Sequence, residues 1–509
     1  MKDNNHTPTL RCYNHLMDAY ANTNNVNQVV NVFKRINQEG LTPDVYSYSS
    51  MIKALTMDTR LEDAFIVFKQ MKKLNLIPTQ PIFANLISGC LKSQQIDKAW
   101  ETFDEMRISY HQPDEVTFTL MLHACAKKGE VERALNIFED MVNQQLYPTD
   151  VTFNVLIHAC AKRPDYYNEA FSLFDQMKNT YGFQPDLITY NTLIGVCAWK
   201  KDLSRARDLF RYIVNDDSMV PDIHSYTNMF WCYANYNPPS SSSSITTTTK
   251  ENDIKESTSL TSTNIESILP LALPNRRSEI VNEAKHLFNY MIQQQQATVD
   301  DHNNSNITVE KNTSPIITTQ LLTTYLNIHV MQRQYRECIN IYDDLFSKYN
   351  VTPNAHTFMV MLRYCYQTKD SILAWRIWDE YQSFLESRTL HDSENMNDMS
   401  IMQQKQLLLK HEQQQYREGW TKQQQRKMII MMANTLAKSN ELNYSIQLLN
   451  SISKDKDFKP LKLKEVKMIY DRAILLEDED SKEVITRLCS HNSKNFKPGS
   501  FKYTRINVK

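Results

Sequence analysis

Glycine is scarce in this sequence, with 7 residues in a chain of 509. Phosphate-cradling loops, tight hairpins and nucleotide-binding turns need glycine where the backbone turns sharply or approaches a ligand. The scarcity therefore argues against a Rossmann-type or P-loop enzyme. Leu, Met, Gln, Lys, Glu and Ala are abundant, and these residues favour helices, so we expect a mostly helical fold.

An excess of positive charge is also missing, because the formal net charge is -1. Any nucleic acid must therefore be bound through the local placement of Lys and Arg rather than through overall charge. No run of about 18 or more apolar residues occurs, which predicts no membrane span. The N-terminal residues 1–6 resemble neither a secretory signal nor an Arg-rich transit peptide, so no leader is expected in them.

The nine cysteines include no C-x-x-C pair. Cys90, Cys125, Cys160 and Cys197 are separated by 35, 35 and 37 residues, which indicates one small buried residue per structural repeat rather than a metal site. The odd count and the lack of a signal fit a reducing compartment. The acidic run 477–480 is expected to be a solvated surface, so we predict neither a metal nor a cofactor.

A repeat of 35 residues organises most of the chain. Each unit carries a small or aliphatic residue, a Phe four residues later, and a proline near its end. These markers are Val29 and Phe33, Ala64 and Phe68, Ala99 and Phe103, Ala134 and Phe138, Ala170 and Phe174, Ala206 and Phe210, with Pro43, Pro78, Pro113, Pro148, Pro185 and Pro221. The units are 10–44, 45–79, 80–114, 115–149, 150–186 and 187–222.

The apolar pattern within the unit 115–149 predicts two antiparallel helices. The first, over about 116–127, ends where Lys128-Gly129-Glu130 breaks the pattern, and the second covers about 131–143. One such hairpin cannot bury its apolar face alone, so neighbouring hairpins must stack. We predict an all-α fold, an α-solenoid (superhelix) of stacked helix-turn-helix repeats.

Polar segments interrupt the array and define the expected domain organisation. The segments are a stub (1–9), repeats one to six with the first helix of repeat seven (10–236), a disordered Ser/Thr-rich insertion (237–277), the second helix of repeat seven (278–292), a polar linker (293–314), repeats eight and nine (315–390), a Gln-rich segment (391–425), and degenerate helical repeats with a tail (426–509). In repeat nine, Ala374 and Trp378 take the small and aromatic positions.

The first helices read V-T-F-N-V-L-I-H-A-C-A-K at 151–162 and I-T-Y-N-T-L-I-G-V-C at 188–197. Tetratricopeptide repeats pair helices of similar length, but their first helix carries a W-x2-L-G-x2-Y pattern that these strings lack. Together with the period and the closing Pro-Asp, the strings resemble the pentatricopeptide-repeat family, P-type. The resemblance is specific over 10–222, fair over 319–378 and weak after about 390.

The resemblance implies sequence-specific binding of single-stranded RNA, one base per repeat. In this family the fifth and last residues of a unit together read one base. Carried over to this sequence, Asn14 with Asp44, Asn154 with Asp186 and Asn191 with Asp222 would favour uracil, Thr323 with Asn354 adenine, and Thr119 with Thr149 and Ser49 with Thr79 a purine. Thr227 takes the fifth position of repeat seven, and Asp114 is paired with Ala84, which has no hydrogen-bonding group.

Two further sets of residues follow from the same resemblance. Val116, Val151 and Ile188 stand at the second position, where the family packs side chains against base faces. Lys92, Lys127 and Lys162 recur at the thirteenth position, where the family contacts phosphate. Three lysines on one edge of a solenoid would form a basic track in a chain of nearly neutral total charge.

Structural roles compete with these assignments. An Asp that follows Pro and precedes a helix is a natural N-cap, and a residue can cap and read a base at once. Asn in a first helical turn is unremarkable, and a Lys at a helix end is favoured by the helix dipole. The Asp, Asn and Lys residues recur at the same positions of successive repeats, and this recurrence supports the RNA-binding hypothesis.

Three functions remain open at this point. The chain is expected to be an RNA-binding protein of mitochondrial RNA metabolism that supports transcript stability, processing or translation, with RNA-processing or ribosomal proteins as further partners and no small-molecule substrate. The localisation follows from the family resemblance and from the Gln-, Asn- and Ser/Thr-rich insertions. The alternative is a scaffold for protein partners. An enzyme is not expected, because the sequence lacks a zinc-deaminase signature and a metallonuclease-like set of aspartates.

Overall fold

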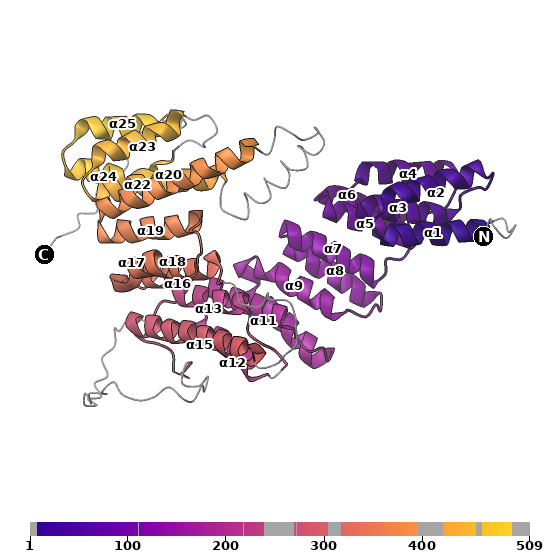
Figure 1. Cartoon of the computed structure of the whole chain (residues 1–509), viewed down its shortest axis with the longest axis horizontal. Coiled ribbons are helices and arrows are strands. Elements are labelled where there is room, and N and C mark those ends of the chain that lie inside the picture. The colour runs from indigo at the N-terminus through magenta and orange to yellow at the C-terminus, as the bar shows by residue number, and fades with distance from the viewer. Residues whose placement is uncertain are drawn as a thin grey trace. The chain divides into compact units, whose positions relative to one another are not determined.

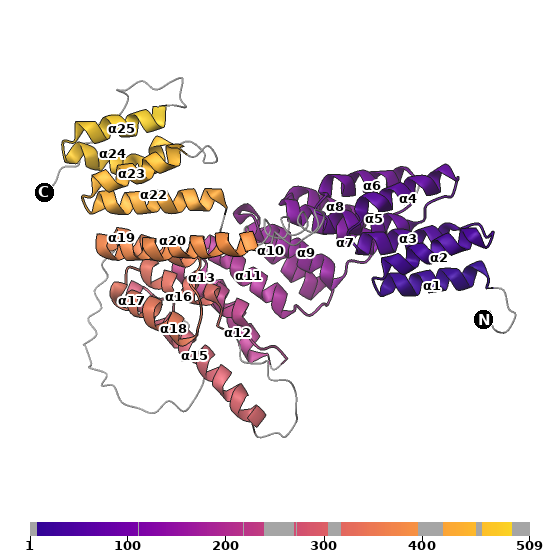
Figure 2. The same cartoon turned by 45° about the horizontal axis from the view of Figure 1, so that its top comes forward.

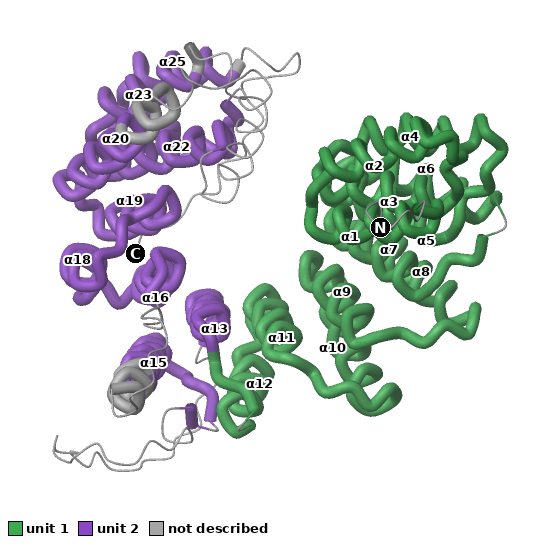
Figure 3. Tube along the Cα trace, turned by 45° about the vertical axis from the view of Figure 1, so that its right-hand side comes forward, with its two compact units in different colours: residues 1–221 green, residues 222–509 purple. Residues whose placement is uncertain are grey.

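The computed structural model describes residues 8–109, 111–216, 218–238, 269–270, 272–303, 317–394, 421–454 and 461–490 (Figure 1). These residues form helices joined by turns, and no strand occurs among them. The expected all-α solenoid is thereby confirmed. The chain divides into two compact units, residues 1–221 and 222–509 (Figure 3), and each is described by itself.

Unit 1 is a stack of helical hairpins. The first helices are α1 (Leu10–Asn22), α3 (Val45–Met57), α5 (Gln80–Lys92), α7 (Glu115–Lys128), α9 (Asp150–Ala161) and α11 (Leu187–Lys200). The second helices are α2 (Val26–Gln38), α4 (Leu61–Lys73), α6 (Ile96–Ile108), α8 (Val131–Asn143), α10 (Tyr167–Asp175) and α12 (Leu203–Asn215). Each first helix packs against the next first helix, whereas the second helices contact mainly first helices (Figure 2). The first helices therefore form one continuous layer.

Local sequence explains where these helices begin and end. Asp44, Asp114 and Asp186 cap first helices by accepting the backbone N–H three residues later, at 2.9, 2.8 and 2.8 Å. The turn to the second helix places one residue in the left-handed region, which is Gly129 in one repeat (φ 76°) but Gln94 in the one before (φ 59°). A non-glycine residue costs roughly 1 kcal/mol there, so a chain with little glycine accepts modest strain at its turns.

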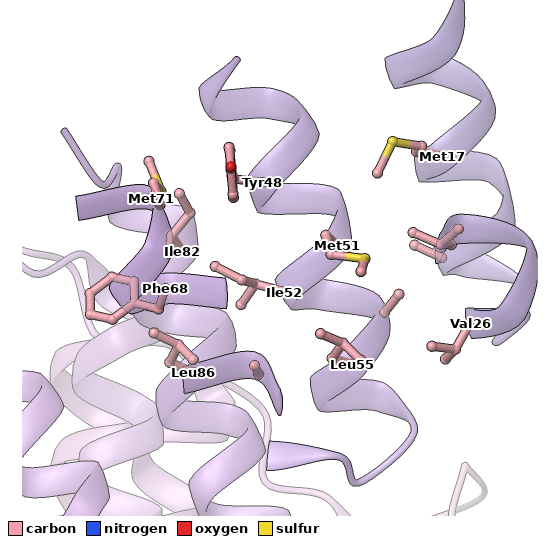
Figure 4. Close-up of a cluster of buried hydrophobic side chains, with 14 of the residues drawn as sticks. Met17, Val26, Tyr48, Met51, Ile52, Leu55, Phe68, Met71, Ile82 and Leu86 are labelled. Atoms are coloured by element: carbon pink, nitrogen blue, oxygen red, sulfur yellow. The ribbon is translucent and has the colours of Figure 1, made fainter. Parts of the chain in front are cut away.

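The core of unit 1 runs from repeat to repeat without a break. Figure 4 shows side chains such as Met17, Ile52 and Leu86, each fully buried, from three successive first helices. The Phe of five second helices, α2, α4, α6, α8 and α10, lies edge-on to the aromatic ring at the fourth residue of the next repeat. The pairs are Phe33–Tyr48, Phe68–Phe83, Phe103–Phe118, Phe138–Phe153 and Phe174–Tyr190, with centroids 5.3, 5.6, 6.1, 5.6 and 5.7 Å apart. Such pairs add about 0.5–1.5 kcal/mol each beyond burial.

The periodic cysteines belong to this core, as predicted. Cys90, Cys125, Cys160 and Cys197 are fully buried free thiols. Burial raises the pKa of Cys125 to about 11 and that of Cys160 to about 12. The thiols therefore stay protonated at neutral pH and act as small apolar side chains.

Two of the repeats longer than 35 residues absorb the extra residues in irregular helical turns. In the unit 150–186, a 3-10 turn, η2 (Pro164–Tyr166), precedes α10 and a π-helical segment, η3 (Gln176–Thr180), follows it. In the unit 319–354, the π-helical segment η5 (Ile341–Leu345) takes up the extra residue. A π-helical turn takes up an added residue without ending the helix, so the stacking continues.

Unit 2 continues the same construction. Its helices are α13 (Ile223–Asn235), α15 (Arg277–Asn303), α16 (Thr319–Met331), η4 (Tyr335–Glu337), α17 (Cys338–Asn340), α18 (Phe346–Lys348), α19 (Ala355–Thr368), α20 (Ser371–Glu394), α22 (Lys422–Lys438), α23 (Leu442–Lys454), α24 (Leu463–Leu475) and α25 (Glu479–Ser490). Successive first helices α13, α16, α19, α22 and α24 pack against one another.

The expected segment boundaries in unit 2 need correction. The sequence predicts a helix over 278–292 followed by a linker, but α15 continues to Asn303, because the Gln-rich stretch that follows contains no helix breaker. Leu269, assigned to the disordered insertion, is buried. Both α20 and α22 extend into the segment 391–425. The rest of these interruptions, 239–268, 271, 304–316 and 395–420, lies outside the described residues, as do 1–7 and 491–509.

Gly89 sits where two repeats approach closely, and it gives a first stability prediction. A Cβ at this position would lie 2.8 Å from Thr56 Cγ2 and 2.9 Å from Thr56 Cβ, and the Thr56 hydroxyl is tied to the Lys53 carbonyl at 2.9 Å. We expect Gly89→Ala to lower the free energy of unfolding by about 1–2 kcal/mol, because overpacking outweighs the gain in helix propensity. Urea denaturation followed by circular dichroism measures the change.

Thr56→Ser is the matched second change, since it removes the methyl group that the new Cβ would strike. The double variant should recover part of the loss caused by Gly89→Ala, because the Thr56 Cβ at 2.9 Å remains. A single variant as stable as the wild type would show that the two helices separate at little cost.

Candidate nucleic-acid interface

The fifth and last residues of a repeat meet at one edge of the first-helix layer. The fifth residue lies near the start of a first helix, and the last residue caps the next first helix, which packs alongside. Asn14 Nδ2 donates a hydrogen bond to Asp44 Oδ1 at 3.0 Å. Asn154 Nδ2 donates to Asp186 Oδ2 at 3.3 Å. Both partners of these two predicted base-reading pairs are thus in direct contact.

Pairs that carry Thr at the fifth position meet through a bridging hydroxyl. Thr119 Oγ1 lies 3.1 Å from Thr152 Oγ1, which lies 3.1 Å from Thr149 Oγ1. In unit 2, Thr323 Oγ1 lies 2.7 Å from Thr357 Oγ1, which donates to Asn354 Oδ1 at 3.1 Å. Each pair therefore shares one small polar cluster, although its two members do not touch.

The remaining predicted readers are less closely organised. Ser49 is half-buried, and Thr79 caps α5 without a side-chain hydrogen bond. Thr227 is buried, and its hydroxyl donates to the Ile223 carbonyl at 2.7 Å. Asp114 accepts the Thr117 hydroxyl at 2.6 Å, with Ala84 opposite. Asn191, which is buried in unit 1, and Asp222, which caps α13 in unit 2, lie on either side of the boundary between the units.

Nearly every last residue of a repeat also acts as the N-cap of the next first helix. Asp44, Asp114, Thr149, Asp186, Asp222 and Asn354 all accept the backbone N–H three residues later. In Asp44 the same carboxylate oxygen also accepts from Asn14. The cap therefore fixes the last residue in the place where the fifth residue of the same repeat reaches it, so capping does not exclude a base-reading role.

Apolar side chains stand exposed beside these polar pairs. Val116, Val151 and Ile188 are 60, 53 and 69% exposed, although Val and Ile are usually buried. Tyr46 holds the same second position in the repeat 45–79 and is 74% exposed. Sequence reasoning missed Tyr46, although its phase in the repeat would have identified it. An exposed apolar or aromatic residue at this position offers an apolar contact to a ligand in these four repeats.

A groove of about 470 Å³ lies along the first helices of the repeats 80–114, 115–149 and 150–186. Its walls combine apolar and polar side chains. They include Val116 and Val151 of the predicted base-packing set, Thr119 and Thr149 of the base-reading set, and Lys92 and Lys127 of the phosphate set. The three kinds of predicted contact therefore come together in one place.

Each thirteenth-position lysine reaches back to the preceding repeat. Lys127 Nζ donates to the Leu91 carbonyl at 3.1 Å, and Lys162 Nζ donates to the Ala126 carbonyl at 2.6 Å. Lys92 Nζ lies 3.2 Å from Met57 Sδ. These ammonium groups cap the C-terminal ends of neighbouring helices. All three lysines keep part of their surface exposed, so a phosphate could still contact them.

Two histidines that sequence reasoning missed extend this basic track. His123 and His158 occupy the ninth position of adjacent repeats, and both keep an exposed edge. Partial desolvation, followed by the charges of Lys127 and Lys162, lowers the pKa of His123 below its ordinary value of 6.5. Desolvation, Lys162 and His123 lower the pKa of His158 in the same way. Both rings are mainly neutral at pH 7, and a nearby anion would favour their protonation.

The described residues were also compared with two other kinds of site, a metal centre and a membrane span. They contain no group of three or more His, Cys, Asp or Glu side chains placed to hold a metal ion. None of the helices that the structure describes has both the length and the apolar content to cross a bilayer. The site is a periodic surface in which a polar pair, an apolar side chain and a cation recur along stacked helices. It defines a helical-repeat protein with a periodic surface along its first helices.

Family models identify these repeats. The PPR repeat family matches residues 8–57, 78–127 and 113–162, the pentatricopeptide repeat domain matches 38–93 and 172–236, and a further PPR repeat model matches 151–179. Together these models match residues 8–236, which is less than half of the chain. A comparison with curated proteins gives no match.

One solved structure shares the fold, and two others align less well. The pentatricopeptide repeat protein PPR10 from maize aligns with a TM-score of 0.51 at 16% identity, over 96% of this chain and 65% of that chain. PPR10 in complex with an 18-nt psaJ RNA element aligns with a TM-score of 0.34 at 15% identity, over 97% and 76%. The PPR domain of Arabidopsis thaliana protein-only RNase P 1 in complex with tRNA gives 0.32 at 15%, over 36% and 95%. The chain spans 65% of the length of the first maize structure.

Proposed function

We propose that this chain binds single-stranded RNA sequence-specifically, with one base held at each junction between repeats. The observation that carries the proposal is the contact within predicted base-reading pairs, such as Asn154 with Asp186 at 3.3 Å. Amide and carboxylate groups held side by side present a donor and an acceptor together, as a base edge requires. PPR10, which shares the fold, was crystallised with an RNA element.

The biological setting is part of the same proposal. We place the chain in mitochondria, where it would act on the stability, processing or translation of a transcript together with RNA-processing or ribosomal proteins. The family resemblance and the long polar insertions support this setting. A binding role without catalysis fits a surface built from packing, capping and hydrogen-bonding groups.

RNA selection tests the proposal. The purified full chain is offered a randomised single-stranded pool at about 150 mM salt, which suppresses non-specific binding. We expect enrichment of a short motif with a U-U step, from the adjacent units 150–186 and 187–222. A pool that stays unenriched, with helical circular dichroism intact, would favour the scaffold function and a search for protein partners.

Lys162 allows the phosphate contribution to be separated from helix capping. Lys162→Met keeps the aliphatic stem but loses the charge and the hydrogen bond to Ala126. We expect matching and mismatched RNAs to lose affinity about equally, and the slope of log K against log salt to shrink by about 0.7. Fluorescence anisotropy over a salt series measures both.

Lys98→Met is the control for this variant. Lys98 lies on α6 and pairs with Glu62 of α4, away from the first-helix groove. Its loss should leave the salt slope unchanged. An unchanged slope in Lys162→Met, accompanied only by lower thermal stability, would mean that Lys162 has the capping role alone.

The two histidines make RNA affinity depend on pH. In the free protein their pKa values lie below 6.5, and a phosphate beside the rings would raise those values, so the complex binds more protons than the free chain. RNA affinity should therefore rise severalfold as the pH falls through the histidine pKa values of the complex. It should level off once the pH lies below the histidine pKa values of the free protein. The double variant His123→Asn, His158→Asn should flatten this rise between about pH 7.5 and 5.5. A wild-type chain with constant affinity over this range would show that no phosphate lies near the rings.

A further inference from the structure

A buried hydroxyl joins the two members of several base-reading pairs. It belongs to the third residue of the following repeat, and the four cases are Ser47, Thr152, Thr189 and Thr357, each at most 1% exposed. Such a residue sits below the surface on which the RNA would lie and does not itself face a base. The sequence analysis assigned it no role.

The carboxylate and the hydroxyl together fix which way the Asn amide points. A carboxylate can only accept hydrogen bonds, so Asn154 must turn its Nδ2 group toward Asp186. Its Oδ1 then faces Thr189, whose hydroxyl hydrogen-bonds to that oxygen and also lies 2.6 Å from Asp186 Oδ1. A flipped amide would set its oxygen against the carboxylate. The network therefore permits one orientation.

The first junction repeats this arrangement. Ser47 Oγ donates to Asn14 Oδ1 at 2.6 Å and lies 3.0 Å from Asp44 Oδ1, while Asn14 Nδ2 donates to Asp44. Two junctions 140 residues apart in sequence thus hold their Asn in the same way. The two Thr-containing clusters use Thr152 and Thr357 in the equivalent place.

Other junctions of the same chain lack one part of the network. Fully buried Ile82 takes the third position after the pair Ser49 and Thr79, so no hydroxyl joins that pair. At the next junction Thr117 contacts Asp114 at 2.6 Å, but Ala84 offers nothing to orient. Because these junctions belong to the same unit, they provide internal comparisons.

We infer that the third-residue hydroxyl is a positioning residue that determines base specificity, an inference that rests on the proposed RNA binding. With the amide fixed, the second Nδ2 proton of Asn154 and the Asp186 carboxylate offer a donor beside an acceptor. Uracil offers the complement, an O4 acceptor beside an N3–H donor, whereas cytosine offers the reverse order. A hydroxyl that holds the amide therefore sets the preference for uracil over cytosine.

Thr189→Val tests the inference in the full-length chain. Valine keeps the shape of the side chain and the backbone N–H bond to Asp186, but it removes the hydroxyl that holds Asn154 Oδ1, so that only the Asp186 carboxylate still orients the amide. Equilibrium binding is measured with two RNAs that carry the selected motif and differ only by U or C at the base read by the unit 150–186. We expect the ratio of the two affinities to fall by about tenfold, since one placed hydrogen bond contributes about that much discrimination.

Thr117→Val is the matched control, because it deletes the same hydroxyl where Ala84 leaves no fifth-residue group to orient. It should leave base preference unchanged. Thr189→Ser, which keeps the hydroxyl, should retain the wild-type ratio. If Thr189→Val lowers the melting temperature sharply, Ile82→Thr tests the inference instead. This variant adds the hydroxyl, so it should increase the ratio of affinities for the preferred and other bases at the repeat 45–79.

The outcomes separate the inference from the function on which it rests. A stable Thr189→Val chain with the wild-type U-to-C ratio overturns the inference while RNA binding stands. An equal loss of discrimination in Thr117→Val also overturns it, since that result would reflect helix capping. A wild-type chain without any base preference overturns the proposed function, and the inference with it.

Discussion

Exchanging Asn154→Thr and Asp186→Asn together is expected to change the base preferred by the unit 150–186 from uracil to adenine. The same chain already holds this combination at Thr323 and Asn354, joined through Thr357. Thr189 occupies the position of Thr357 in the repeat that follows the changed one, so the new pair finds its bridging hydroxyl in place. The shorter Thr also leaves the room that a purine needs.

The size of this effect should be large for two substitutions at an exposed junction. A mismatched base typically costs about 1–3 kcal/mol, or roughly tenfold to a hundredfold in affinity. Competition between RNAs that differ at one base measures the switch. Asn154→Thr alone is the control, and it should weaken binding to uracil without full preference for adenine. An unchanged preference in the double variant would refute the assignment of base-reading positions while leaving RNA binding possible.

Phe153→Ala is expected to give the largest loss of stability. The ring is fully buried in unit 1, edge-on to Phe138 with centroids 5.6 Å apart and 5.1 Å from Tyr181. Its removal leaves a cavity at the junction between two repeats, where a buried Phe is worth about 3–5 kcal/mol. In a solenoid each repeat depends on its neighbours, so the unfolding transition of unit 1 should also broaden.

Val151→Ala is the matched control, two residues away on the same helix. Its side chain is 53% exposed, so its truncation should cost less than about 0.5 kcal/mol. The same variant should weaken RNA binding if Val151 packs against a base. Urea denaturation and RNA titration of both variants give the contrast. A Phe153→Ala chain that loses under about 1 kcal/mol, by the same measure, would mean that neighbouring rings close the cavity.

The sequence predicted the helices and the phase of each residue because both depend on local, repeated patterns. Apolar spacing within one hairpin fixes which face is buried, and the same face recurs in every repeat. Phe153 and Val151 could therefore be assigned to opposite faces of their helix from the sequence alone. The pairing of Asn14 with Asp44 could be suggested only through the family resemblance, since the two residues are 30 positions apart.

Features that depend on how repeats stack could not be predicted. The length of a Lys side chain does not show that Lys162 reaches the Ala126 carbonyl of the repeat before it. Likewise, Thr189 reads in sequence as an ordinary residue of a first helical turn, and only the side-by-side packing of α9 and α11 brings it to Asn154. The extension of α15 was missed because a polar stretch reads as a linker even when its residues favour helix.

The link between α13 and α15 differs from the other hairpin turns, and it affects how the chain folds. Elsewhere the two helices of a hairpin are joined by a few residues, whereas α13 ends at Asn235 and α15 begins at Arg277. Closing so long a connection costs about 2 kcal/mol more entropy than closing a three-residue turn. The contacts that repay it, such as the bond from Tyr233 to Glu283 and that from Gln332 to the Tyr233 carbonyl, join residues 50 and 99 positions apart. Folding rates fall as the sequence separation between contacting residues grows. Unit 1 can therefore nucleate at any hairpin, whereas the formation of the contacts of α13 with α15 is expected to be the slow step in the folding of unit 2.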